Sequence, residues 1–588
     1  MNFDKVLDDL GEFGRWQKIN IALLWFPIMM AGTLVLLGSF TLLEPDEYRC
    51  KIKGCDKNDF QFDDFEERWA REELFPCYNN SNNDNDQCSG EDEFCVFLKP
   101  VVSNGKCLSN LTNERVHCNS SSEFAFGKFG MEKTVTSEFN MFCDEILKLC
   151  RPMADCLYMV GLLAGGMVFG MMPDKIGRRH ALLAAILTAF VGNLAGVFMP
   201  GCWSYGVSRL VSGAGHYGSK IASFILIIEI MGKKKRLPCA PWVTLSGFFA
   251  NLCGVPFALG EVLVVLLAMV FTDWRNLQVA GTVFCLLVGM VWFFISESPR
   301  WLIATGNIKE ARKVIETAAK INKVEVINEL NDDANITPDD IKYENNSRPE
   351  GTSSLILLPS PSDEDYGIKD LFNSTCCHIT IALFVVWLAF GLLYYGITLA
   401  SHKIKVTSNL HLSFIVICLI EIPAAVIFPI IMDIFGRKPL VALCLLIPGI
   451  LCIISAFHRT SWVFTVLIII TKMAVTGGKT VSQIFTAELY PTPVRTTALG
   501  ACSTLGRIGS IAAPWVAVYL PDHDSLPEWV PILIFGIVAI IGSMASLLLP
   551  ETLGHPLPDN FNDLENMKKN DKPIWKWINP KTWTTPRK

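Results

Sequence analysis

The sequence predicts an all-α polytopic membrane protein with twelve transmembrane helices in two six-helix pseudo-repeats. The first observation is composition. Of 588 residues, 51% are hydrophobic and 18% are charged, and apolar runs recur from about residue 18 to about 550. Each run approaches the ~20 residues that a helix needs to cross a bilayer. The second observation is a charged turn after the second run that returns after the eighth, so the two halves of the chain repeat one another.

The chain opens with an acidic, amphipathic stretch, residues 1–17, which we expect to form a short cytoplasmic helix. It lacks the basic start and small-residue cleavage site of a secretory signal peptide. The first membrane helix, residues 18–43, is therefore expected to serve as an uncleaved signal anchor.

A long hydrophilic loop, residues 44–150, follows the first membrane helix. Cysteines that cluster in a polar segment indicate disulfides in an oxidising space, and their pairing cannot be read from sequence. The candidates are Cys50, Cys55, Cys77, Cys88, Cys95, Cys107, Cys118 and Cys143. Glycosylation sequons at Asn79, Asn110 and Asn119 agree with an extracellular position. The C-x-x-C pairs typical of zinc sites are missing, so no metal is predicted.

The remaining chain divides into two groups of membrane helices and two polar segments. Helices 2–6 are expected within 151–299, with the fifth at about 240–270, and helices 7–12 within 376–550. Between them lies a charged insert, 300–375, with an amphipathic helix over Asn307–Asn331 and a linker after it. The tail, 551–588, is expected to be cytoplasmic.

Basic residues indicate the orientation. Lys175–Arg179 and Gly232–Arg236 both fall in loops on the same side of the predicted membrane helices. Lys and Arg concentrate in cytoplasmic loops, so these loops, the insert and both termini should be cytoplasmic. The formal net charge of −6 gives no indication of a nucleic-acid partner.

The internal repeat is clearest in two turns. Asp174-Lys-Ile-Gly-Arg-Arg179 follows the second helix, and Asp433-Ile-Phe-Gly-Arg-Lys438 follows the eighth. Ser296-Glu-Ser-Pro-Arg300 and Pro550-Glu-Thr-Leu-Gly554 follow the sixth and twelfth helices. Repeats of this kind place a substrate site near the midplane, between two halves that rock around it.

Further motifs extend the pattern along the chain: Gly11-Glu-Phe-Gly14, Glu297-Ser-Pro-Arg-Trp-Leu302 and Ala487-Glu-Leu-Tyr-Pro491 with Arg495. With the cysteine-rich loop and the repeated turns, they make the chain resemble the organic cation, carnitine and organic anion transporter family of the major facilitator superfamily. The resemblance covers nearly the whole chain. It implies the major facilitator fold and a plasma-membrane transporter that works by alternating access, without covalent chemistry, enzyme activity or a cofactor.

The resemblance also implies a set of gating charges, in which the turns pair with acids at the helix ends and hold the cytoplasmic side shut while the outer side is open. The set is Asp174, Arg178, Arg179, Glu229, Glu297, Arg300, Asp433, Arg437, Glu488 and Arg495.

Ionisable residues inside membrane helices are costly and therefore functional candidates. They are Lys220, Glu421, Lys479 and Arg507. The resemblance implies that an acid at Glu421 suits a cation, whereas Arg507 matches the arginine of anion and carnitine transporters. A zwitterion would satisfy both. Lys220 and Lys479 depart from the family pattern and add positive charge. Alternatively, the four charges pair among themselves as a structural network.

Other polar and aromatic residues are weaker candidates. Trp387 and Tyr394 could line the cavity and attract a quaternary ammonium through their ring faces, and Tyr394 also matches a family tyrosine. Ordinary helix packing is the alternative. His216 lies one helical turn before Lys220 and is expected to be a satisfied structural histidine. Glu261 is expected near the outer mouth of the cavity.

We therefore predict a transporter of small organic ions in the lipid bilayer of the plasma membrane, with zwitterions or cations favoured. An organic anion is the alternative within this class. A non-transporting membrane receptor is the alternative from another class, and intact gating motifs in both halves argue against it. Na+, H+ or a counter-substrate remains open as the coupling partner.

Overall fold

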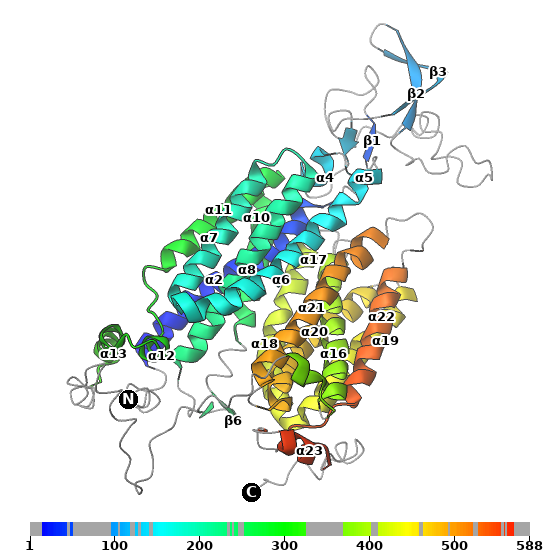
Figure 1. Ribbon diagram of the computed structural model, residues 1–588. Helices are drawn as coiled ribbons and strands as arrows, with labels where there is room; N and C mark the ends of the chain where they lie inside the picture. The colour runs from blue at the N-terminus through cyan, green and yellow to red at the C-terminus, as the bar shows by residue number, and fades with distance from the viewer. Residues whose placement is uncertain are drawn as a thin grey trace, which may run out of the picture.

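The computed structural model describes residues 14–43, 48–50, 96–103, 106–117, 124–126, 131–139, 141, 145–231, 236–237, 240–244, 252–324, 368–374, 376–400, 410–457, 462–491, 494–520, 527, 529–553, 558 and 561–569. These residues form two helical bundles side by side (Figure 1). Nine of the described helices are long and apolar enough to cross a membrane. The helices that carry Lys220 and Arg507 are more polar and are not among the nine.

The first bundle contains α2 (Arg15–Thr41), α6 (Cys150–Ile176), α7 (Arg178–Val197), α8 (Cys202–Ile230), α10 (Gly254–Val270) and α11 (Trp274–Val291). Small residues let its helices approach closely. A Cβ at Gly165 of α6 would overlap the backbone of Ala214 in α8. A Cβ at Gly170 of the same helix, by contrast, would face open space.

The second bundle contains α16 (Cys377–Ala400), α17 (Leu410–Leu419), α18 (Glu421–Phe435), α19 (Arg437–Phe457), α20 (Trp462–Leu489), α21 (Arg495–Pro514) with η7 (Trp515–Tyr519), and α22 (Val530–Leu547). One span breaks between α17 and α18 because Pro423 lacks an N–H and its ring crowds the preceding turn.

The two bundles repeat the same packing. In the first, α2 packs on α10, α6 on α8 and α7 on α11; in the second, α16 packs on α21, α18 on α20 and α19 on α22. The described residues therefore form six spans in each half, as the sequence predicts. The bundles meet where α10 packs on α17 and α18, and where α21 packs on α6.

We name the two ends of the bundles by their residues. The disulfide end carries the Cys150–Cys202 bridge, which joins the starts of α6 and α8. The turn end carries Gly177 and Gly436. The bundles touch at the disulfide end, where the Phe40 ring of α2 lies 4.9 Å from that of Phe414 in α17. Cys156 of α6 also donates to the Ile511 carbonyl of α21, at 3.1 Å.

The polar loop contains β-strands as well as short helices, although the sequence predicts an all-α protein. β2 (Val96–Ser103) and β3 (Lys106–His117) form an antiparallel hairpin beyond the disulfide end, and β1 (Tyr48–Cys50) pairs with β4 (Phe124–Phe126) (Figure 1). Two short helices, α4 (Val135–Glu138) and α5 (Glu145–Lys148), lead into α6.

Most of the predicted disulfide and glycosylation sites lie outside the described residues: Cys55, Cys77, Cys88, Cys95, Cys118, Cys143, Asn79 and Asn119. Cys50, Cys107 and Asn110 lie in strands whose backbone alone is described. The bridge that the structure does contain, Cys150–Cys202, joins two cysteines that the sequence analysis left out. Cys150 ends the polar loop and Cys202 begins a membrane helix, so neither stood out as part of the cysteine cluster.

Three predicted boundaries need correction. The fifth span begins at Gly254 rather than near 240, because residues 240–244 form β6, paired with β5 (Arg236–Leu237). The insert helix is α13 (Ile308–Asn322), which ends at Lys323 in a left-handed conformation rather than continuing to Asn331. The first helix begins at Arg15, and residues 1–13 lie outside the described part.

Shorter helices cover the turn end (Figure 1). They are α12 (Pro299–Ala304) and α13 after the first bundle, η5 (Ile368–Phe372) before the second, and α23 (Phe561–Lys569) in the tail. Asn322 of α13 accepts from the Trp16 backbone N–H at 2.8 Å and donates to Gln17 at 3.1 Å. The amphipathic part of the insert is thus attached to the start of α2.

Candidate functional site

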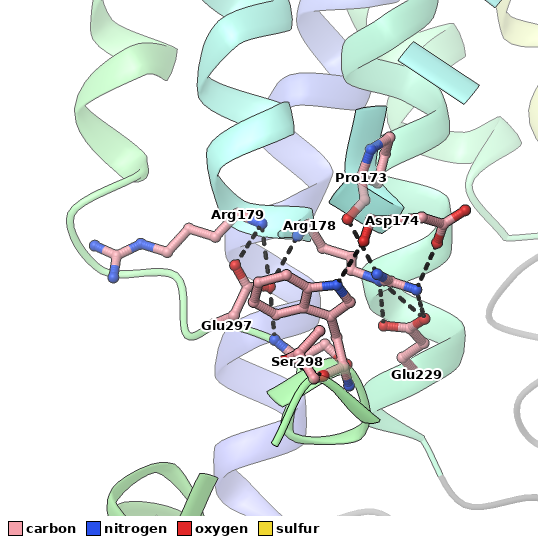
Figure 2. A network of polar contacts seen from close by, with 9 residues as sticks. Pro173, Asp174, Arg178, Arg179, Glu229, Glu297 and Ser298 are labelled. Atoms are coloured by element: carbon pink, nitrogen blue, oxygen red, sulfur yellow. Dashed lines mark hydrogen bonds and ion pairs between the residues drawn. The ribbon is translucent and has the colours of Figure 1, made fainter. Parts of the chain in front are cut away.

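The first turn cluster is built around Arg178, the first residue of α7 (Figure 2). Its guanidinium donates from Nε to both carboxylate oxygens of Glu229, at 3.2 and 3.1 Å. The same group lies 3.0 Å from Asp174 Oδ1 and donates to the Pro173 carbonyl at 3.0 Å. One arginine therefore ties the end of α6 to the end of α8.

Glu297, after α11, completes this cluster from below the turn (Figure 2). Its carboxylate accepts from the backbone N–H groups of Arg178, Arg179 and Ser298, at 2.9–3.2 Å. These N–H groups belong to helix starts, where no backbone acceptor is available. Gly177 has φ +96°, and a Cβ there would lie 2.7 Å from Glu297 Oε2. The glycine lets the carboxylate reach the first turn of α7.

The second turn cluster repeats this arrangement. Arg437 donates to both oxygens of Glu488, at 3.0 and 3.1 Å, and lies 2.7 Å from Asp433. Glu551 accepts from the backbone N–H groups of Arg437 and Lys438, at 3.0 Å each. Arg178 and Glu229 are 51 residues apart, as are Arg437 and Glu488.

Glu551 was quoted in the Pro-Glu-Thr motif but was not placed among the gating residues. It also accepts from the N–H groups of Thr552 and Leu553, at 2.9 Å each. Burial raises the pKa of the Glu551 carboxyl, and the four backbone donors oppose that shift without reversing it. The signal that could have found Glu551 was its equivalence to Glu297 in the internal repeat.

Of the other predicted gating residues, Arg179 and Arg495 make different contacts. Arg179 lies over the Trp292 ring, 4.2 Å from its centroid. Arg300 is half-buried in α12. Arg495 donates to the backbone carbonyls of Tyr490 and Pro558. Arg179 and Arg495 thus bind through a ring face and carbonyls rather than through ion pairs.

Every contact given above for Arg178 and Arg437 stays within its own bundle. In this conformation the bundles meet at the disulfide end and where α10 packs on α17 and α18. The pairing of the turn charges with acids at helix ends, which the sequence analysis expects, is present for both arginines. Their role in holding the cytoplasmic side shut stays a prediction. Their contacts bind each turn to the helices of its own half.

A central charged group lies at mid-depth in the second bundle. Glu421, at the break before α18, is 2% exposed, and its Oε1 lies 2.7 Å from Lys472 Nζ in α20. Tyr394 donates to Glu421 Oε2 at 3.0 Å, and Lys472 donates to Thr398 at 2.6 Å. Both oxygens of Glu421 are thus engaged by its own bundle.

Lys472 is the residue that sequence reasoning missed. It lies in the apolar run of α20, seven residues before Lys479 and so on nearly the same helix face. It carries the same signal that singled out Lys479, a charge inside a membrane helix. Its side chain is fully buried.

The remaining three central cations have aromatic partners. Lys479 Nζ lies 3.7 Å from the Tyr394 ring centroid, and Lys220 Nζ lies 4.2 Å from that of Phe257. Arg507 lies 4.0 Å from the Tyr217 ring centroid and donates to Tyr395 at 3.1 Å. In the part of the chain that the structure describes, none of the three forms an ion pair with a carboxylate. All three are half-buried.

The three cations come from both bundles: Lys220 from α8, and Lys479 and Arg507 from α20 and α21. They are close enough to interact electrostatically with one another. Like charges held together repel, so this group is a site where an added anion is favoured. The alternative, a network of ion pairs among the four predicted charges, is not formed among the described residues, because Glu421 pairs with Lys472 instead.

Three other candidates are placed as follows. His216 Nδ1 is hydrogen-bonded to the Tyr158 hydroxyl, the satisfied structural role expected of it. Trp387 donates to Thr486 at 2.9 Å and packs beside Gly506. Glu261 lies in the middle of α10, beside Glu421 and Lys472, so its expected place near the outer mouth was wrong.

The first bundle contains a buried ion pair of its own, which the sequence analysis also missed. Arg209 of α8 lies 4.0 Å from Asp155 of α6 and over the Tyr158 ring. Its Nη1 donates to the Leu34 carbonyl at 3.3 Å. These contacts join α2, α6 and α8 and give the pair a structural role.

Comparisons with known proteins agree with this architecture. The chain is 29% identical to the Organic cation transporter protein of Drosophila melanogaster, over 97% of this chain and 96% of that protein. It is 28% identical to Organic cation/carnitine transporter 2 of Homo sapiens, over 96% and 94%. The xylose transporter XylE of E. coli, in a partially occluded inward-open conformation, has the same fold, with a TM-score of 0.53 and 15% identity over 92% of this chain and 100% of that chain.

Residues 153–559 match the family described as "Sugar (and other) transporter". This match covers both bundles from α6 onward and both turn clusters. The resemblance expected from the motifs is thereby confirmed. The chain belongs to the sugar (and other) transporter family of the major facilitator superfamily, beside the organic cation and carnitine transporters that it resembles over nearly its whole length.

Proposed function

We propose that the chain transports small organic anions by alternating access. The observation that carries this proposal is the distribution of charge at mid-depth. The only central acid predicted from sequence, Glu421, pairs with Lys472. The basic side chains of Lys220, Lys479 and Arg507 have no carboxylate partner among the described residues. This geometry favours an anion over the cation or zwitterion that the sequence analysis preferred.

Arg507 is the best-placed group to bind the substrate's anionic end. A guanidinium offers two parallel donors to a carboxylate or sulfonate. Its present partners, the Tyr217 ring and the Tyr395 hydroxyl, are neutral and can be exchanged for an anion. Tyr217 belongs to the first bundle and Arg507 to the second, so substrate bound here would touch both moving halves.

The test is uptake by cells, normalised to surface protein, of three probes of different charge: benzenesulfonate, tetraethylammonium and carnitine. A sulfonate stays ionised and crosses lipid poorly, so its uptake reports the protein. Benzenesulfonate should be taken up, and Arg507→Ala should weaken its apparent affinity about tenfold to a hundredfold, the equivalent of about 1.5–3 kcal/mol. Preferred uptake of tetraethylammonium would overturn the proposal.

The role of Glu421 separates an anion from a zwitterion. The double variant Glu421→Gln with Lys472→Met removes the buried pair together and leaves no lone charge behind. Benzenesulfonate uptake should survive this change. If carnitine is the better substrate of the normal protein and loses its uptake in the double variant, Glu421 binds an ammonium group and the zwitterion is the substrate class.

We also propose the orientation that the basic loops indicate. Residues 44–150 would face outward at the plasma membrane, and both termini and residues 300–375 would be cytoplasmic. The hairpin beyond the disulfide end and the helices at the turn end are consistent with this arrangement (Figure 1). Epitope tags at positions 85 and 340 test it: only the tag at 85 should be labelled on intact cells, and labelling at 340 without permeabilisation would overturn it.

A further inference from the structure

Glu261 is a buried acid between the two bundles that the proposed binding site does not use. It lies in α10 of the first bundle, where α10 packs on α17 and α18 of the second. The residue is 1% exposed, and its Oε2 has no hydrogen-bond partner among the described residues. The thiol of Cys418 in α17 lies beside its carboxyl group.

Titratable and charged groups face Glu261 from several helices. They are Cys418 of α17, Glu421 of α18, Lys472 of α20, Lys220 of α8, and Tyr394 and Tyr395 of α16. On α2, the backbone of Met29 lies against Gly260, and the Thr33 hydroxyl donates to the Gly260 carbonyl. Neither of these two residues is ionisable, so α2 contributes no charge to this contact.

The charges in this contact do not balance if both acids are ionised. Lys472 lies 2.7 Å from Glu421, so that ammonium is already committed. Lys220 lies against the Phe257 ring. An ionised Glu261 would then be a second carboxylate beside Glu421 with no donor on Oε2. A buried charge without a partner costs several kcal/mol, and a carboxyl group avoids this cost by taking up a proton.

We propose that Glu261 is a proton-carrying site: it holds a proton while the two bundles are packed together at mid-depth, and it exchanges that proton with water when they part. This inference rests on the proposed transport of an organic ion. In each cycle the O–H bond of Glu261 breaks and the proton passes to water on one side. The carboxylate then takes up a proton from water on the other side. Movement of one proton with one monoanion would carry no net charge.

The geometry explains why proton exchange would follow the conformational cycle. Glu261 moves with the first bundle, whereas Cys418, Glu421 and Lys472 move with the second. Rocking of the halves would separate Glu261 from all three and admit water to its carboxyl group. The Glu421–Lys472 pair stays within the second bundle and stays intact, so the change in environment falls on Glu261.

The first experiment measures the proton directly and needs no substrate. Infrared spectra of the purified protein at neutral pH should show the carbonyl stretch of a protonated carboxyl group. This band should be lost in Glu261→Gln and kept in Glu316→Gln, a matched control on the exposed face of α13. A band that is missing from the normal protein, or that persists in Glu261→Gln, would overturn the proposal.

The second experiment measures coupling in proteoliposomes, with whichever of benzenesulfonate, tetraethylammonium and carnitine is transported. A pH gradient should drive accumulation of the probe by the normal protein several-fold above its level without a gradient. Glu261→Gln should still exchange internal for external probe but should lose the response to the gradient. Glu261→Asp, which restores a carboxyl group, should regain part of that response, and this guards against simple misfolding.

The outcomes separate the two proposals. If none of the three probes is transported, the proposed function fails, and the infrared band still decides whether Glu261 holds a proton. If a probe is transported but the normal protein ignores the pH gradient, or Glu261→Gln follows the gradient as the normal protein does, the proton-carrying role is overturned while transport stands.

Discussion

The two turn clusters share their central ion pairs but differ in exposure. In the first, the Asp174 side chain is 73% exposed, whereas in the second Asp433 is 10% exposed. Both pair with an arginine four residues later in the chain. An exposed ion pair contributes ~0–1 kcal/mol because water screens it, whereas a buried pair leaves a costly lone charge when one partner is removed. The same sequence motif is therefore expected to contribute differently to the stability of the two halves.

The partners of the two arginines extend the contrast. In the second cluster the Thr552 hydroxyl donates to Glu488 at 2.6 Å. In the first, the Trp301 indole donates to the Asp174 carbonyl at 3.1 Å, and its ring faces Arg178. The first cluster thus stays open to water and to further partners, while the second is closed by its own bundle. We expect the second cluster to matter more for folding and the first to matter more for transport.

The largest difference should come from removing the arginines. Arg437→Ala would leave Asp433, which is 10% exposed, without its cation beside the half-buried Glu488. Removal of one partner from a buried ion pair costs about 3–5 kcal/mol. Arg178→Ala would leave the exposed Asp174 in water and strand Glu229 alone. Thermal melting of purified protein and surface biotinylation should show a much larger loss for Arg437→Ala. Equal losses would contradict the comparison.

Substitution of the aspartates should lower stability by a smaller amount. Asp433→Asn removes the charge of a buried partner of Arg437 and should cost roughly 1.5–3 kcal/mol of stability, the value of a hydrogen bond to a charged group. The measurement is the shift in melting temperature, with Asp174→Asn as the matched control. A shift in the control as large as that in Asp433→Asn would show that exposure does not set the difference.

Substitution of the glycines tests a feature that the two clusters share, a glycine with positive φ beside a carboxylate. Gly177 and Gly436 have φ of +96° and +94°, and a Cβ at either would lie 2.7 Å from an oxygen of Glu297 or Glu551. With ψ of 153° and 159°, both glycines lie in an extended region that is essentially restricted to glycine. Alanine there costs about 1–3 kcal/mol, and the carboxylate would also have to move. Gly177→Ala and Gly436→Ala should lower the melting temperature to a similar extent. A large difference between them would mean that the two turns are not equivalent.

The smallest effect on stability should come from Asp174→Asn, at about 1 kcal/mol or less. We nevertheless expect this variant to slow uptake more than it lowers surface expression, because an exposed charge is free to make contacts in one access state only. Uptake of benzenesulfonate per surface molecule is the measurement. Normal uptake kinetics would remove Asp174 from the gating set.

The sequence was sufficient for the features that repeat along the chain. Spans follow from apolar runs because a bilayer requires about 20 apolar residues, and the Asp-Gly-Arg turns follow from two copies of one motif. The family resemblance pointed to Glu229 and Glu488 as acids that pair with these turns. The sequence was insufficient where pairing between neighbouring strands decides the secondary structure. Residues 240–244 form a strand paired with β5 instead of the start of a membrane helix.

What the sequence determined by itself was therefore the number and order of the spans, the two turns, and the presence of charges at mid-depth. Only the tertiary structure decided which of those charges are paired. Glu421 meets Lys472, 51 residues further along and on another helix, and Glu261 reaches both from the opposite bundle. The physical reason is that hydropathy depends on the residues of one helix, whereas an ion pair depends on which helices are neighbours and which faces they turn to one another.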